Sequence, residues 1–371
     1  MADLFHYEKN ADDQTMIKTG GKKRKKIQFI EELTEGETVN DLFSVKRKNA
    51  PRGYKKGTFF DLILTDKTGE INVKFWGGDN KERVRRLFES FSTGDVVQIR
   101  AGSVERYKKK LQISINEKSG GLRRCNEQEY DESDFVPALS EEDIKRLFES
   151  LQTYIDTISN PQLKTLLQEF FEDEDFVQAY THTPSAMSHH HNLIGGNLQH
   201  SVGVVKLSYT IAEYYSGLDR DLLITGAILH DVGKIKSYKT TTSIGRTDAG
   251  NFIGHIVIGD RWIREKVADL RKKDISFDET LELKLCHMIL SHHGRLEYGA
   301  PKLPAFPEAA ALFQADLMDS QVKHFLQKIE ETKMDVDENW SFMYDPDING
   351  RKAVYIDLDE KKKRKSVDEI V

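Results

Sequence analysis

The chain has 371 residues, of which 38% are hydrophobic and 31% are charged. This composition excludes a wholly disordered protein, and no apolar run reaches the ~20 residues that a membrane helix needs. Two cysteines exclude a disulfide framework or a zinc ribbon, and the acidic N-terminus lacks the pattern of a secretory signal, so we expect a cytoplasmic protein with no membrane partner.

Charge and histidine are unevenly distributed along the chain. Residues 21–125 hold 25 Lys and Arg against 14 Asp and Glu, a balance of +11, whereas the rest has a balance of −17. A basic domain of this kind attracts polyanions such as nucleic acid. Eleven of the 12 histidines lie between His182 and His324, which indicates that the chemistry of the protein is located there.

The N-terminal part reads as a β-domain. After a flexible acidic arm at residues 1–20, β-branched and aromatic residues predict two strands that flank the turn Asp66–Gly69 and form a hairpin. A helix and two further strands follow. Strand signals run over residues 37–117, and with one strand before the hairpin they give five strands with one helix before the fourth, the order of an OB-fold barrel over residues 21–125. The strands with assigned bounds are 58–65, 69–76, 95–100 and 111–115, and the helix is 81–91.

The runs GTFFDLILTDKTGEINVKFWGG and GDVVQIRAGSVERYKKKLQISI resemble the OB-folds of single-strand-binding and tRNA-binding proteins. Such barrels stack bases on aromatic side chains in a basic groove. Alternatively, the aromatic residues pack in the barrel core, and the basic residues lie in solvated loops. The candidate platforms are Phe59, Phe75, Trp76 and Tyr107, and the candidate phosphate contacts are Lys46, Arg47, Arg52, Lys55, Lys56, Arg106, Lys108, Lys109 and Lys110.

The rest of the chain reads as helical. Residues 126–139 form an acidic linker, and Ser140 is placed to cap a first helix. Helical spacing then continues over a domain at residues 140–335 with no strand pattern, and residues 336–371 read as a charged tail. The predicted fold is therefore multidomain α+β, with a five-stranded OB barrel followed by an all-α bundle.

Several histidines and aspartates lie on apolar helix faces or at their ends. A single buried histidine is usually a hydrogen-bonded core residue, but imidazole and carboxylate together are the preferred ligands of Zn, Mn, Fe and Co. Seven candidates recur in the order His, His-Asp, His, His-His, Asp, which favours a metal site. They are His200, His230, Asp231, His255, His292, His293 and Asp316.

This order, with Lys234 three residues after the His-Asp pair, resembles the HD superfamily of metal-dependent phosphohydrolases. The runs HHNLIGGNLQHS, ILHDVGK, IGHI and LSHHGRLEYGAP behind an OB domain are similar to YhaM-type 3′-to-5′ exoribonucleases. Asn197 departs from the leucine expected of that family, which concerns packing and not ligation.

The resemblance implies two divalent cations, with manganese expected and Co, Fe, Ni or Zn as alternatives. It assigns the first cation to His200, His230, Asp231 and Asp316, and the second to Asp231, His255, His292 and His293. Asp231 would bridge both, and Lys234 would contact the scissile phosphate unless it faces solvent. His190 and His191 would contact the substrate or form a hydrogen-bonded loop, and Asp319 is the rival of Asp316 as ligand.

The sequence thus favours an exonuclease that holds single-stranded RNA, with DNA as a second candidate, on the OB barrel. The resemblance alone gives the 3′-to-5′ direction, and the oligomeric state stays open. One alternative is an HD nucleotidohydrolase or cyclic-nucleotide phosphodiesterase that acts on a small molecule, but such a substrate does not need a basic domain with a charge balance of +11. Another is a non-catalytic nucleic-acid-binding protein, but such a protein does not need a full set of metal ligands.

Overall fold

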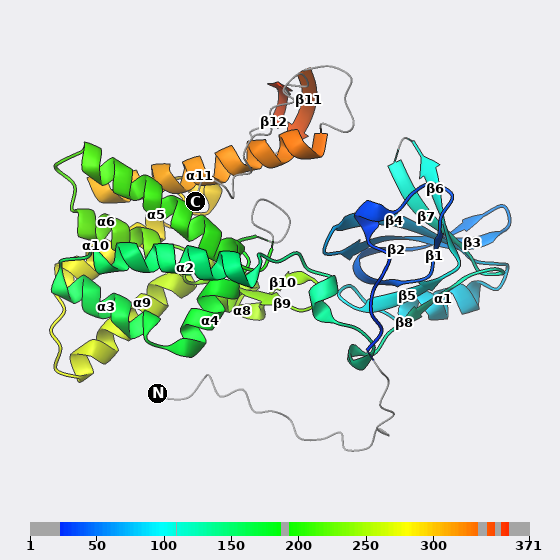
Figure 1. Cartoon of the computed structure of the whole chain (residues 1–371), viewed down its shortest axis with the longest axis horizontal. Coiled ribbons are helices and arrows are strands. Elements are labelled where there is room, and N and C mark those ends of the chain that lie inside the picture. Colours follow the sequence, from blue (N-terminus) through cyan, green and yellow to red (C-terminus); the bar gives the residue numbers. More distant parts are fainter. Residues whose placement is uncertain (1–22, 109, 187–192, 333–339, 346–349, 356–371) are drawn as a thin grey trace. The chain divides into compact units, whose positions relative to one another are not determined.

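The structure of the chain is a computed structural model that describes residues 23–108, 110–186, 193–332, 340–345 and 350–355 (Figure 1). Its contacts divide the chain into two compact units, Met1–Asp134 and Phe135–Val371. The expected acidic arm, Lys109, His190 and His191 lie outside the described residues. Among the described helices, none combines the length and the apolar character that crossing a bilayer requires.

The first unit contains one curled, eight-stranded sheet in the order β1-β6-β7-β4-β3-β2-β5-β8. The parallel pairing of β4 with β7 and the antiparallel pairing of β2 with β5 are those of an OB-fold. The OB prediction is confirmed, although the sheet has more strands than the five expected. The strands are β1 Thr38–Val39, β2 Leu42–Tyr54, β3 Gly57–Asp66, β4 Gly69–Trp76, β5 Val96–Arg100, β6 Gly102–Tyr107, β7 Lys110–Asn116 and β8 Gly121–Arg124, with helix α1 at Lys81–Glu89.

The predicted hairpin is present as β3 and β4, which pair from Asp66 opposite Gly69 to Phe59 opposite Trp76. The Asp66 carboxylate closes the turn because it accepts the backbone N–H of Thr68 at 2.9 Å. Successive side chains of β3 alternate between the core and the surface. This alternation fixes which aromatic residues remain available at the surface.

The structure contradicts the prediction that Phe75 is a stacking platform. Its side chain is only 2% exposed and stacks on Phe60 in the barrel core, with ring centroids 4.9 Å apart. Its neighbour Trp76 points to the opposite face of the sheet, because side chains in a strand alternate. Phe75 is therefore a core residue and is not placed to stack a nucleobase.

The second unit is a helical bundle. The hydroxyl of Ser140 accepts the N–H of Asp143 at 3.1 Å and caps α2 as expected. The helices are α2 Glu141–Asp156, α3 Pro161–Phe171, α4 Glu174–His182, α5 Gly196–Tyr214, α6 Arg220–Leu229, α7 Lys234–Ser237, α8 Asp248–Phe252, α9 His255–Lys272, α10 Glu279–Ser291 and α11 Pro307–Thr332.

Two hairpins lie where no strands were expected. Strands β9 (Tyr238–Thr240) and β10 (Ile244–Arg246) pair between α7 and α8, where no strand pattern was predicted. Strands β11 (Trp340–Asp345) and β12 (Gly350–Tyr355) pair within the stretch that was expected to be a charged tail. Strands of three residues are too short to produce a readable alternation in the sequence.

One hydrophobic cluster forms the core of the bundle. It draws on α5, α6, α10 and α11, whose buried side chains include Val204, Ile228, Ile289 and Leu312. Each such side chain stabilises the fold by roughly 1.5–3 kcal/mol through removal of its surface from water. Each of these four helices carries polar residues on its buried face or at its end, and these polar residues lie close together.

Candidate metal centre and nucleic-acid-binding surface

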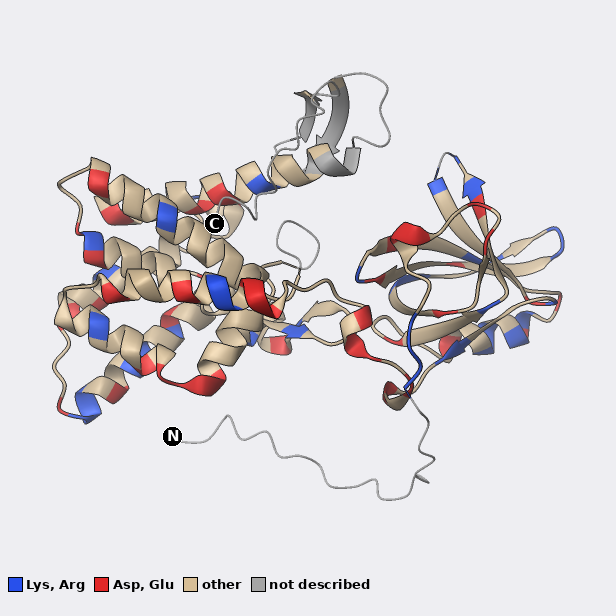
Figure 2. Ribbon diagram, viewed as in Figure 1, with Lys and Arg blue, Asp and Glu red and all other residues tan. Residues whose placement is uncertain are grey.

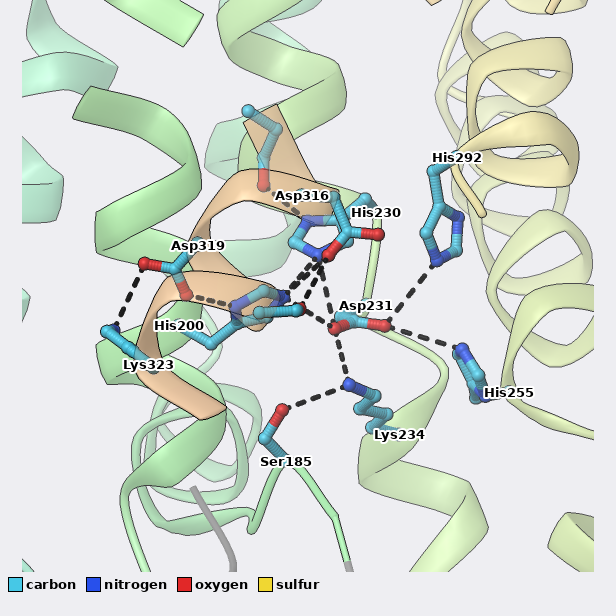
Figure 3. A network of polar contacts seen from close by, with 12 residues as sticks. Ser185, His200, His230, Asp231, Lys234, His255, His292, Asp316, Asp319 and Lys323 are labelled. Atoms are coloured by element: carbon cyan, nitrogen blue, oxygen red, sulfur yellow. Dashed lines mark hydrogen bonds and ion pairs between the residues drawn. The ribbon is translucent and has the colours of Figure 1, made fainter. Parts of the chain in front are cut away.

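Three helices bring the first group of candidate ligands together (Figure 3). His200 lies on α5, His230 and Asp231 follow the last residue of α6, and Asp316 lies on α11. The Nε2 atom of His200 lies 3.1 Å from Oδ1 of Asp316, 3.2 Å from Nε2 of His230 and 3.5 Å from Oδ2 of Asp231. The Nε2 atom of His230 lies 3.1 Å from the same Asp231 oxygen.

These separations fit a shared cation. Ligand atoms bound about 2.1 Å from one metal lie roughly 3.0 Å apart as octahedral neighbours and roughly 3.4 Å apart in a tetrahedron. The four separations given above, from 3.1 to 3.5 Å, lie close to these values. Two carboxylates so close together in a buried place require a compensating positive charge, and imidazole and carboxylate are suitable ligands for a divalent metal.

A second group of candidate ligands lies beside the first. His255 is the first residue of α9, and His292 and His293 follow α10. Their ligand atoms lie within 4.8 Å of one another. Among the described residues, neither Nε2 of His255, nor Nε2 of His292, nor Oδ1 of Asp231 has a hydrogen-bond partner. Such buried, unpaired atoms are costly unless a ligand engages them, so they fit a second cation.

Asp231 lies between the two groups. Its Oδ2 atom faces His200 and His230, while its Oδ1 atom lies 3.5 Å from Nε2 of His255 and 3.8 Å from Nε2 of His292. Each carboxylate oxygen of Asp231 therefore faces a different group of candidate ligands. This arrangement suits a carboxylate that bridges two cations.

Backbone contacts orient most of the imidazoles. The Nδ1 atoms of His230, His292 and His293 lie 2.8, 2.7 and 2.8 Å from the carbonyl oxygens of Ala227, Ile289 and Tyr298. A ring that donates from Nδ1 keeps the Nε2 lone pair free for a metal. His287 lies outside both groups and accepts the N–H of Ala305 through Nε2 at 3.0 Å.

The electrostatics of the site keep Asp231 charged and two imidazoles of the second group, His255 and His292, neutral. Burial would raise the pKa of Asp231, but the Lys234 ammonium and His230 outweigh burial and hold this pKa well below its ordinary value. Burial lowers the pKa of His255 to about 3 against the opposing effect of Asp231, and it also lowers the pKa of His292. Both rings are therefore neutral and able to act as ligands at neutral pH.

His200 behaves differently from these two histidines. Burial would lower its pKa, but hydrogen bonds to Asp316 and Asp319 raise this pKa to about 9. The carboxylates around His200 thus stabilise positive charge at this ring. A proton or a divalent cation can supply that charge, and the two compete for the same ring.

Lys234 does not face solvent, which was the alternative considered for it. Its side chain is 11% exposed, and Nζ donates to Oδ2 of Asp231 at 2.6 Å and to Oγ of Ser185 at 3.0 Å. Burial would lower the pKa of Lys234, but Asp231 raises it, so the ammonium is retained. Sequence reasoning missed Ser185, because nothing in its neighbourhood signals that it meets a lysine 49 residues away.

The structure separates the roles of Asp316 and Asp319. Asp316 lies beside Nε2 of His200, on the side of the candidate cation, whereas Asp319 lies 2.7 Å from Nδ1 on the other side of the ring. Only Asp316 is placed to share a cation with His200. The spacing of the two aspartates on one helix face could not make this distinction.

The OB unit carries an aromatic cluster on its surface. Phe59 and Trp76 lie on neighbouring strands with ring centroids 5.4 Å apart, and Tyr54 packs 6.0 and 5.0 Å from them. The three rings line a cavity of about 710 Å³ together with Lys55 and Lys56. Tyr54 was missed because bulges in β2 obscure the alternation of that strand.

A second cavity of about 360 Å³ holds further candidate contacts. Lys74, Tyr107, Lys108 and Lys110 line it, and Tyr107 is 56% exposed. Figure 2 shows basic residues at the tips of the β2–β3 and β6–β7 hairpins, where Lys55, Lys56, Lys108 and Lys110 lie, whereas Lys74 lies within β4. Arg106 lines neither cavity and pairs with Glu35 at 3.1 Å.

The chain matches known families over both units. Residues 197–321 match the HD domain, and residues 44–118 match the OB-fold nucleic acid binding domain. Proteins named 3′-5′ exoribonuclease YhaM from Listeria welshimeri, Bacillus subtilis and Listeria monocytogenes are 30%, 28% and 31% identical to this chain. Each alignment covers 80% of this chain and 90% of the relative.

Proposed function

The chain belongs to the YhaM family of 3′-5′ exoribonucleases, and we propose that it hydrolyses single-stranded RNA at a dimetal centre built on Asp231. The observation that carries this proposal is the position of Asp231, whose two oxygens face two separate groups of histidines. We propose His200, His230, Asp231 and Asp316 as ligands of one cation, and Asp231, His255, His292 and His293 as ligands of the other.

Bound divalent cations supply an activated water at neutral pH and neutralise charge on phosphate oxygens. Manganese is the proposed metal, because a mixed imidazole and carboxylate set suits it, with Co, Fe, Ni or Zn as alternatives. Backbone-oriented imidazoles keep their Nε2 atoms aimed at the centre, and the low exposure of the site limits access of bulk water.

Lys234 is the proposed substrate-directed residue. Its ammonium donates to Asp231 and Ser185, which leaves the third of its three N–H donors for a phosphate oxygen. A fixed cation next to a reacting phosphate stabilises the negative charge that develops in the transition state. His190 and His191 remain proposed substrate contacts on the basis of the family resemblance.

The OB unit is the proposed binding surface for the strand. Tyr54, Phe59 and Trp76 offer stacking surfaces, and cations approach the rings, with Nζ of Lys74 5.1 Å from the Trp76 centroid. Aromatic platforms beside basic side chains bind single strands with little sequence preference. Lys55, Lys56, Lys108 and Lys110 are the proposed phosphate contacts.

Incubation with 5′-end-labelled oligonucleotides tests the proposal. The full chain, supplied with Mn²⁺, should shorten single-stranded RNA in steps of one nucleotide from the 3′ end. Parallel reactions with single-stranded DNA, with duplex RNA and with Co²⁺ or Zn²⁺ measure substrate and metal preference. Internal fragments at the earliest time point, or hydrolysis of only mononucleotides and cyclic nucleotides, would contradict the exonuclease proposal.

A further inference from the structure

His200 differs from its neighbours in what holds its second nitrogen. Its Nδ1 atom lies 2.7 Å from Oδ2 of Asp319, and both side chains are buried, at 3% and 7% exposure (Figure 3). The other oxygen of Asp319 lies 3.1 Å from Nζ of Lys323. A chain of three charged or polar groups therefore ends on the ring that faces the first candidate cation.

The contrast with the other candidate ligands is chemical. His230, His292 and His293 place Nδ1 against neutral backbone carbonyls. A carboxylate is a stronger acceptor than a carbonyl, so it fixes the ring more firmly and makes Nε2 a better electron donor. Of these four rings, His200 thus has the strongest support for binding a cation.

The fold makes room for this carboxylate. Asp319 lies one turn after Asp316 on α11, so one helix supplies both the proposed ligand and the partner of His200. On α5, a Cβ atom at Gly203 would lie 2.3 Å from Oδ1 of Asp319, which is too close for any side chain. Glycine at this position therefore allows the aspartate to reach the ring.

We propose that Asp319 is a positioning residue that makes the cation position at His200, His230, Asp231 and Asp316 bind more tightly than the position at His255, His292 and His293. The first position has two carboxylates and a charged partner behind His200. The second has one shared carboxylate and three imidazoles. This inference rests on the proposed dimetal centre, and it predicts that the two positions fill in order.

Equilibrium dialysis of the full chain against increasing Mn²⁺, with metal content read by elemental analysis, tests the inference. The wild-type chain should bind two Mn²⁺ with unequal affinities. Asp319→Asn preserves the size of the side chain and removes its charge. It should weaken the tighter step about 10- to 100-fold and leave the weaker step within about threefold.

Asp221→Asn is the matched control, because Asp221 accepts the N–H groups of Ser159 and Asn160 away from the site. It should leave both affinities unchanged. Equal affinities in wild type, or an unchanged tighter step in folded Asp319→Asn, would overturn the inference while leaving the dimetal centre intact. Wild-type protein that binds no Mn²⁺ would instead reject the proposed centre itself.

Lys323→Met gives an independent test if Asp319→Asn does not fold. It leaves the Asp319–His200 pair in place and removes the ammonium 3.1 Å behind it. The tighter Mn²⁺ affinity should change about two- to tenfold, while the weaker one stays constant. No change in the tighter step, or equal changes in both, would overturn the inference.

Discussion

Replacement of Asp231 by alanine should remove both cations and also destabilise the helical unit through Lys234. The carboxylate lies 2.6 Å from Nζ of Lys234, and the two side chains are 2% and 11% exposed. Removing one partner of a buried ion pair typically costs 3–5 kcal/mol, because the remaining charge is left without compensation. For a unit of this size, such a loss lowers the melting temperature by roughly 6–20 °C.

A double-variant comparison separates the two effects. Calorimetry in the presence of a chelator should show the loss of stability in Asp231→Ala and its recovery in Asp231→Ala combined with Lys234→Met, which removes the stranded charge. Elemental analysis should show no bound metal in either variant. His287→Gln, which keeps an acceptor for the N–H of Ala305 outside the two ligand groups, should bind metal like wild type.

Two outcomes would refute this reasoning. Full metal content and turnover in Asp231→Ala would show that the carboxylate does not bridge the cations. A destabilisation below about 1 kcal/mol, or one that Lys234→Met fails to relieve, would show that burial of the lysine charge does not depend on Asp231.

Lys234→Ala should keep its bound metal but lower turnover about 10²- to 10³-fold, because it removes a fixed cation beside the reacting phosphate. Unchanged steady-state turnover would exclude a role of Lys234 on the substrate. Mn²⁺ at a hundredfold excess over its Kd should stabilise the helical unit by about 2.7 kcal/mol in calorimetry, and Asp316→Ala should reduce this gain. Asn197→Leu should raise the free energy of unfolding by about 1–3 kcal/mol, since Asn197 is fully buried and its side-chain amide has no hydrogen-bond partner among the described residues. A loss of stability in denaturant titrations of Asn197→Leu would show that the amide is needed.

The sequence predicted the parts of the site that a local pattern encodes. The His230-Asp231 pair and the pair of His292 and His293 were visible as adjacent residues at helix ends, and the structure places one pair in each of the two ligand groups. The hairpin was visible because its turn residues lie between two β-branched runs. These features depend on neighbours in the chain, so periodicity is sufficient to find them.

Other features depend on packing between distant segments. Phe75 and Trp76 are adjacent aromatics, and only the pairing of β4 decides which one enters the core. Asp316 and Asp319 share a helix face, and only the placement of α5 decides which nitrogen of His200 each one meets. Lys26 stands in a run of lysine and arginine at residues 22–26, yet packing buries it, and it donates to the carbonyl oxygen of Leu42 at 2.7 Å.

A joint action of the OB surface and the metal centre on one substrate can be tested by comparing hydrolysis of a long single-stranded RNA with that of a dinucleotide, by the full chain and by Phe59→Ala, at two salt concentrations. The Phe59 ring lies in the aromatic cluster of the OB unit, and loss of one stacked base costs about 1–3 kcal/mol. Phe59→Ala should show a roughly 5- to 150-fold lower kcat/KM on the long strand and unchanged dinucleotide hydrolysis. High salt should reduce hydrolysis of the long strand more steeply than that of the dinucleotide. Tyr214→Ala, at an 80% exposed aromatic residue of the helical unit, should change neither rate. An unchanged ratio of long-strand to dinucleotide hydrolysis in Phe59→Ala would contradict the claim that the OB surface and the metal centre act on one substrate.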